Sequence, residues 1–158
     1  MKRAALIALL ILGVLTVRPA PAWADATAFL GWSPTITNRS ATGVSIGISA
    51  LILGFEFEYS HINDASASGV PSLGSGMFNV LIQTPTKLSL YVTAGAGIYH
   101  ESLDSVGHTN FGDNVGGGIK IPIAGPFRVR VDYRVFNLNS SLIGKAEQRI
   151  YVGANFAF

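Results

Sequence analysis

Three histidines lie next to groups that can assist them in acid–base chemistry: Ser60 for His61, Glu101 for His100 and Asp104 for His108. An imidazole beside a hydroxyl and a carboxylate is the arrangement by which hydrolases activate a nucleophile. Residues adjacent along a strand point to opposite faces, however, so Ser60 and His61 cannot share a hydrogen bond there. We therefore predict no catalytic residues. We also predict no cofactor and no metal site, because no two histidines have ligand spacing with a supporting carboxylate.

Charged residues form a second pattern, since they recur at every second position of two segments. In GFEFEYSH, Glu56 and Glu58 alternate with aromatic residues. In FRVRVDYRV, apolar residues alternate with charged ones, which are Arg128, Arg130, Asp132 and Arg134. A period of two is typical of a β-strand whose two faces lie in different surroundings. Both segments are therefore predicted strands with charge on one side only.

The same alternation continues along the chain and predicts eight strands in one all-β domain, residues 25–158. It is clear in TGVSIGISAL, LSLYVTAGAGIYHE and the terminal RIYVGANFAF, and weaker in FNVLIQ and NVGGGIKIPI. A short first strand is expected from Ala26 to Trp32.

The expected connections alternate in length. Loops are predicted at Ser33–Ser40, Ile62–Leu73, Leu103–Asn110 and Asn139–Ala146, and tight turns near Leu51–Leu53, Thr84–Lys87 and Ala124–Pro126. Long loops at one end and short turns at the other are typical of an antiparallel up-and-down membrane barrel.

A water-soluble β-sandwich would use the same strands, and the surroundings of the charged face distinguish the two folds. In a sandwich the charges face water. In a membrane barrel the apolar face meets lipid, and the charges point into a narrow lumen where they must pair. Across that lumen Glu56 and Glu58 are expected to reach Arg128, Arg130 or Arg134. The full predicted network is Glu56, Glu58, Lys120, Arg128, Arg130, Asp132, Arg134, Glu147 and Arg149.

The N-terminus has the features of an export signal. Lys2 and Arg3 precede an apolar run too short to span a bilayer as a helix, and Ala22-Trp23-Ala24 has the pattern of a cleavage site, so residues 1–24 are a predicted signal peptide. Cleavage removes three of the 11 basic residues and leaves eight against nine acidic ones, so no basic surface favours nucleic acid. The chain has no cysteine, which excludes both a lipid anchor on cysteine and disulfides.

The closing segments resemble those of the small outer-membrane β-barrel superfamily, the OmpA/OmpX type of eight-stranded transmembrane domain. The similar segments are YVTAGAGIYHE, FGDNVGGGIKIPI and FRVRVDYRVF. The end of the chain, with Tyr151, Phe156 and a final Phe158, resembles the signal that the barrel-assembly machinery reads in such proteins. The resemblance covers residues 25–158 and implies an outer-membrane location with both termini in the periplasm.

The function expected from this resemblance is a structural or surface-interaction role, without enzymatic activity. Two alternatives stay open: a lipid A-modifying enzyme, either a deacylase or an acyltransferase, and a narrow pore of low conductance. Free diffusion is disfavoured because side chains fill the interior of an eight-stranded barrel. The expected partners are outer-membrane lipids and lipopolysaccharide, with the assembly machinery during biogenesis, and the barrel is expected to be monomeric.

Overall fold

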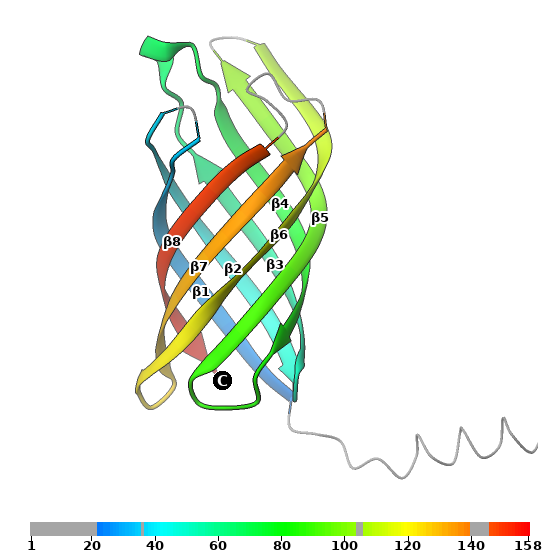
Figure 1. Cartoon of the computed structure of the whole chain (residues 1–158), viewed down its shortest axis with the longest axis vertical. Coiled ribbons are helices and arrows are strands. Elements are labelled where there is room, and N and C mark those ends of the chain that lie inside the picture. The colour runs from blue at the N-terminus through cyan, green and yellow to red at the C-terminus, as the bar shows by residue number, and fades with distance from the viewer. Residues whose placement is uncertain (1–21, 36, 104–105, 140–145) are drawn as a thin grey trace, which may run out of the picture.

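The computed structural model describes residues 22–35, 37–103, 106–139 and 146–158, and in them the chain forms eight strands that close into a barrel (Figure 1). Each strand pairs antiparallel with the next, and β1 closes the sheet by pairing with β8, from Asp25 opposite Ala157 to Trp32 opposite Ile150. The strands are β1 (Ala22–Ser33), β2 (Arg39–Ala50), β3 (Leu53–Ile62), β4 (Ser72–Gln83), β5 (Ser89–Leu103), β6 (Val106–Ala124), β7 (Phe127–Leu138) and β8 (Ala146–Ala157). The predicted eight-stranded antiparallel barrel is confirmed.

The two ends of the barrel differ (Figure 1). At the turn end, where the chain also terminates, β2–β3, β4–β5 and β6–β7 are joined by short connections. Gly125 there has a φ of 53°, which glycine adopts without strain, whereas Leu51 holds a φ of 54° that costs a non-glycine residue energy. At the loop end lie the other connections, including the 3-10 helix η1 (Ser66–Ser68). The predicted turns at one end and longer connections at the other are present, except that only residues 104 and 105 lie between β5 and β6.

Two predicted boundaries were wrong. The segment Leu103–Asn110 was expected to be a loop, but β5 continues to Leu103 and β6 begins at Val106, with Glu101 opposite His108. Alternation fails to reveal strands that project beyond the membrane, because water surrounds both of their faces. β1 is also longer than predicted and begins at Ala22. The predicted cleavage site after Ala24 therefore lies within β1, and residues 1–21 of the predicted signal peptide lie outside the described residues.

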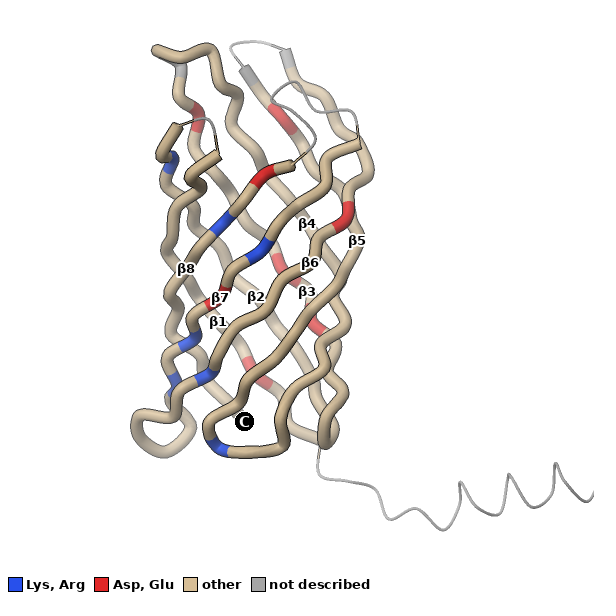
Figure 2. The backbone as a smooth tube through the Cα atoms, in the orientation of Figure 1, with Lys and Arg blue, Asp and Glu red and all other residues tan. Residues whose placement is uncertain are grey.

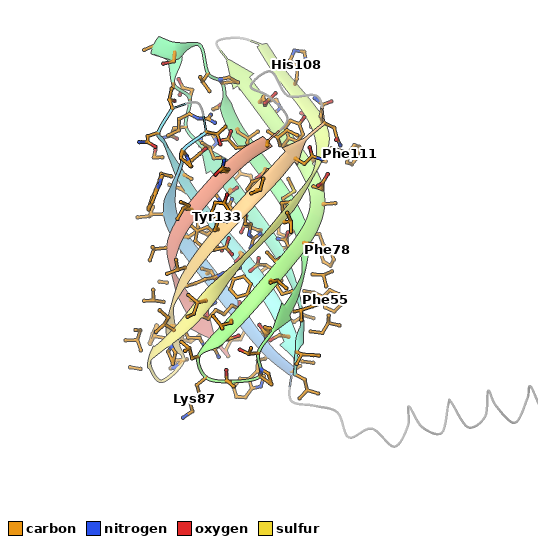
Figure 3. All side chains as sticks on the ribbon, in the orientation of Figure 1. Phe55, Phe78, Lys87, His108, Phe111 and Tyr133 are labelled. Carbon is orange, nitrogen blue, oxygen red and sulfur yellow. The ribbon has the colours of Figure 1, made fainter. Side chains whose placement is uncertain are left out.

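The outer wall of the barrel is apolar. Exposed side chains include Leu30 at 71% and Phe111 at 75%, and Phe55, Phe78 and Phe111 project away from the barrel in Figure 3. On β5 the outward residues stay apolar from Leu90 to Ile98, a stretch that rises about 20 Å along the barrel when strands tilt by about 40°. An apolar band of this height matches the hydrocarbon core that such barrels cross. Among the described residues, no helix is long and apolar enough to cross a bilayer.

The outward residues become polar near the loop end, and this change occurs on strands all around the barrel. We call these residues the polar collar, and they are Thr42, His61, Ser72, His100, Ser102, Thr109, Asp113, Asn137 and Gln148. The collar marks the level at which side chains leave hydrocarbon for the hydrated headgroup region. Its position agrees with a membrane-spanning barrel and not with a water-soluble sandwich.

Candidate functional site: the lumen

The interior of the barrel carries the charges that alternate along the strands. Figure 2 shows charged residues along the length of β7, whereas those of β8 lie near its loop end. Arg130, Arg134 and Arg149 are fully buried, as is Glu58. Small inward residues make room for them. A Cβ added to Gly118, for example, would lie 2.5 Å from the Tyr91 hydroxyl oxygen and 2.2 Å from the Val131 carbonyl oxygen.

Glu56 on β3 is the centre of the network. Its carboxylate accepts hydrogen bonds from Arg130 and from Arg134, the latter at 2.7 Å, and Ser45 donates to it at 3.1 Å. Asp132 lies between the same two arginines on β7, with its oxygens 3.2 Å from the nearest Arg130 nitrogen and 3.0 Å from Arg134 Nε. The two acids therefore pair with both guanidinium groups. A buried charge needs such a partner, because it has lost its hydration.

Tyr91 on β5 connects this centre to a third wall of the barrel. Its hydroxyl donates to Asp132 and accepts a hydrogen bond from Arg130 Nε at 2.7 Å. The Arg130 guanidinium carbon also lies 4.8 Å from the Tyr91 ring centroid, within the range of a cation–π interaction. The network thus spans the lumen instead of following one pair of neighbouring strands.

Arg149 on β8 forms the next layer with Glu58 and three aromatic rings. Its guanidinium donates to Glu58 Oε1 at 2.5 Å and to Ser60 Oγ at 2.6 Å. The guanidinium carbon lies 4.9 Å from the ring centroid of Phe29, 4.8 Å from that of Phe136 and 5.2 Å from that of Tyr151. Stacking against rings and pairing with a carboxylate is a combination that suits arginine better than lysine.

Two further ion pairs lie outside this centre, and sequence reasoning missed one partner in each. Lys120 Nζ is 2.5 Å from Asp25 Oδ2, and Arg39 Nη2 is 2.6 Å from Glu147 Oε1. Ser33 also donates to Glu147. The missed residues, Asp25 and Arg39, lie at or beyond the ends of the segments in which alternation was recognised. A longer reading of the first two strands in steps of two would have placed both on the inner face.

Eight of the nine residues predicted for the network form buried ion pairs, and six of them pair with one another, which are Glu56, Glu58, Arg130, Asp132, Arg134 and Arg149. The ninth residue, Arg128, is on the same face of β7 as Arg130 but is only half-buried near the turn end. It forms no ion pair among the described residues. Within the described ion pairs, five acids meet five bases, which are Asp25, Glu56, Glu58, Asp132 and Glu147 with Arg39, Lys120, Arg130, Arg134 and Arg149. The paired charges cancel, as a poorly hydrated interior requires.

An apolar cluster occupies the part of the lumen nearer the loop end. It consists of buried side chains from five strands, which are Ala41, Ile62, Leu73, Met77, Tyr99, Phe136 and Leu138. The buried Arg39–Glu147 pair lies at this end as well, with Glu147 opposite Phe136 of the cluster. Paired charges and apolar side chains therefore fill the described lumen together.

The remaining predicted residues have clear positions. Tyr151 points inward and stacks on Phe29 with ring centroids 4.0 Å apart, whereas Phe156 and Phe158 point outward at the turn end. The backbone of Phe158 exchanges hydrogen bonds of 2.8 and 2.9 Å with Ala24 on β1. These bonds extend the pairing of β1 with β8 in the full chain, and the predicted cleavage after Ala24 removes them.

The histidines lie toward the loop end, where His61 and His100 are on the outer wall and His108, opposite Glu101, is on the inner face of β6. Ser60 points inward, where it bonds to Ser75 at 2.8 Å, while His61 lies on the outer wall, as strand alternation predicts. His100 Nδ1 is 2.8 Å from Thr109 Oγ1, and His108 is exposed near the start of β6 (Figure 3). Among the described residues, no group of three or more histidine or acidic side chains is placed to bind a metal ion.

Comparisons with known proteins identify the architecture. No family model and no curated protein matches the chain. Similar solved structures include the N-terminal β-barrel domain of Pseudomonas aeruginosa OprF, with 19% identity and a TM-score of 0.68 over 86% of this chain and 97% of that one. Neisserial surface protein A has 15% identity and a TM-score of 0.69 over 87% of this chain and 97% of its own.

The outer membrane enzyme PagL is also similar, with 14% identity and a TM-score of 0.54 over 84% of this chain and 98% of its own. Eight-stranded barrels of this kind have different functions, and sequence identities at this level support only a shared fold. The closed barrel, the apolar wall and these likenesses agree: the chain has the fold of the eight-stranded outer-membrane β-barrels.

Proposed function

We propose that the protein is an outer-membrane barrel with a structural role, whose turn end faces the periplasm and whose loop end faces outward. The observation that carries this proposal is the closed lumen. Arg130, Arg134 and Arg149 are fully buried and paired, and the side chains of the apolar cluster are buried beside them. A barrel of this width has room for side chains or a solute path but not for both.

The barrel serves in this proposal as a rigid frame in the membrane. Ion pairs crossing the lumen connect β3 with β7 and β8, and β1 with β6, so strands that are not neighbours are held together. The loop end, with η1 and the polar collar, is the surface that such a frame presents to partners outside. A surface-interaction role would use that end and would leave the lumen closed.

Conductance measurements test this proposal. Purified protein is inserted into planar lipid bilayers, and flotation of proteoliposomes confirms insertion. The wild-type barrel is expected to show no conductance steps. The double variant Arg149→Ala, Phe136→Ala removes one large side chain from the charged layer and one from the apolar cluster, and it is expected to leak ions. Steps in the wild type as frequent and as large as in this variant would identify a pore and overturn the structural role.

A further inference from the structure

A groove on the lipid-facing wall has the features of a binding site. It has a volume of about 550 Å³ and runs across β4 between β3 and β5. Gly74 and Gly76 form its floor, while Phe57 and Tyr59 line one side and Ile98 lines the other. The outward phase of these residues places the groove on the outer surface of the barrel, separate from the lumen.

The two glycines are not required for strand packing. A Cβ added at either position would approach no atom closer than 3.9 Å. At inward Gly97, by contrast, an added Cβ would lie 2.0 Å from the Gly76 carbonyl oxygen, so that glycine is needed for backbone approach. Glycine within a strand lowers stability and often marks a site where a ligand approaches the backbone. The missing side chains at 74 and 76 therefore create the groove without any packing reason of their own.

The groove changes from apolar to polar along its length. Its part nearer the turn end is lined by the side chains of Phe57, Tyr59 and Ile98, which are all about half exposed. Its part nearer the loop end belongs to the polar collar and includes His61, His100, Ser72, Ser102 and Thr109. An occupant must match both parts, with a hydrocarbon chain in the membrane and a polar head at the level of the collar.

Two imidazoles and a hydroxyl define the polar end. Thr109 bonds to His100 Nδ1 at 2.8 Å, which orients the ring and leaves Nε2 as its second polar atom. His61 borders Gly74, since its Nδ1 would lie 4.0 Å from a Cβ built there. Among the residues that the structure describes, no carboxylate lines this groove. Imidazole and hydroxyl donors without a competing acid suit a phosphate or a sugar hydroxyl.

A second groove meets the first at Tyr59 and His61. It has a volume of about 810 Å³, and its apolar lining includes Ala28, Leu30 and Val44. The ridge formed by Tyr59 and His61 thus has an apolar channel on each side. A lipid with several acyl chains can place chains on both sides of the ridge while its head lies over His61.

We propose that this wall binds lipid A, the phosphorylated and multiply acylated glycolipid of the outer leaflet. The proposal rests on the proposed orientation, which places the collar in that leaflet. Acyl chains lie against Phe57, Tyr59 and Ile98, and the head group contacts His61 and His100. Only components of the bilayer reach a groove at this depth, and lipid A combines the several chains and the phosphates that the two channels and the imidazoles suit.

Native mass spectrometry of the detergent-solubilised barrel tests this inference. Lipid A, phosphatidylethanolamine and phosphatidylglycerol are offered in competition. The wild type is expected to retain one lipid A molecule in preference to either phospholipid. Gly76→Leu places a leucine side chain in the groove. The double variant His61→Ala, His100→Ala removes both imidazoles from its polar end. Each is expected to lower retention at least about tenfold, whereas the matched controls Ala94→Leu and Gln148→Ala, which lie outside the groove, retain it.

Retention of lipid A by Gly76→Leu at the wild-type level would overturn the site. A preference for phospholipid would contradict the outward orientation of the collar and with it the choice of ligand. A wild-type dimer that Gly76→Leu dissociates would assign the groove to contact between copies and would also overturn the proposal. None of these variants alters the lumen, so the conductance test of the structural role is decided independently.

Discussion

The Glu58 carboxylate lies between two guanidinium groups, 2.5 Å from Arg149 and 3.2 Å from Arg134. All three side chains are fully buried. Because a buried ion loses its hydration, removing one partner leaves the other with an uncompensated cost. The free energy of unfolding should therefore depend on the integrity of this cluster and not on any one charge alone.

Glu58→Gln is expected to lower the free energy of unfolding by about 3–5 kcal/mol. Urea unfolding in detergent micelles or lipid vesicles, followed by tryptophan fluorescence, measures this loss. Adding Arg149→Met should recover part of it, with a coupling energy of about 0.5–3 kcal/mol. The control pairs Glu58→Gln with Lys120→Met, whose ion pair is with Asp25, and should be additive within about 0.5 kcal/mol. Strict additivity in both cycles would show that Glu58 and Arg149 are not coupled.

The inward position of these residues could be predicted from sequence, but their partners could not. Alternation sets which face a residue occupies, and it placed Glu56, Glu58 and Arg130 inside. Which side chains meet across the lumen depends on the stagger of the strands around the barrel, which a single strand does not encode. For this reason Arg128 was expected to pair with the acids of β3, although the structure places it near the turn end without an ion pair among the described residues.

At the scale of the strands, β7 is the clearest example of an element with two environments. Val129, Val131 and Val135 face outward, while Arg130 and Arg134 face the lumen. The valines are β-branched and suit a pleated surface in lipid. A shift of one residue in pairing would place the charges in the bilayer, so the membrane enforces the observed register.

Val131→Arg is expected to cost about 2–4 kcal/mol, because it places a charge near the middle of the bilayer. Asn137→Arg on the same strand is the matched control. Asn137 belongs to the polar collar, where the same charge should cost about 0–1 kcal/mol. Reversible unfolding in lipid vesicles measures both values. Equal costs at the two positions would mean that the wall is not embedded in hydrocarbon at Val131.

Assembly of the barrel is expected to depend on the end of the closing strand β8. Deletion of Phe158 removes an exposed ring from the end of β8, so less protein should reach the outer membrane and more should be degraded in the periplasm. Membrane fractionation and immunoblotting measure both pools, and Edman sequencing of the exported chain should begin at Asp25. Phe55→Ala, another exposed ring near the turn end, is the control and should assemble normally. Unchanged outer-membrane levels after the deletion would contradict a role for Phe158 as a signal.

Element boundaries were predictable only where the membrane imposes two environments. Within the apolar band the alternation located β2, β3 and β7 from the sequence. Beyond it, the polar stretch from Ser105 to Asn110 showed no alternation, and most of it is nevertheless the start of β6. The weak alternation of FNVLIQ has a different cause, because Leu81 points inward and gives both faces of β4 apolar residues there.

At the scale of the whole molecule, the distribution of polarity is reversed relative to a water-soluble protein. Paired charges fill the interior, and leucine, isoleucine, valine and phenylalanine cover the wall. In water such a surface would cause aggregation, whereas in a bilayer it is the stable arrangement. The charge network, the proposed structural role and the lipid-binding wall all depend on this reversal.

Spin labels along β5 test this arrangement most directly, because the chain has no native cysteine to interfere. Single cysteines at Leu90, Val92, Ala94, Ile98 and Ser102 are labelled in reconstituted protein, and collision rates with oxygen and with a water-soluble nickel chelate are compared. A membrane barrel predicts that oxygen dominates from Leu90 to Ile98 and that the nickel chelate dominates at Ser102. Nickel access at every position would show a wall in water and would contradict the barrel in the membrane.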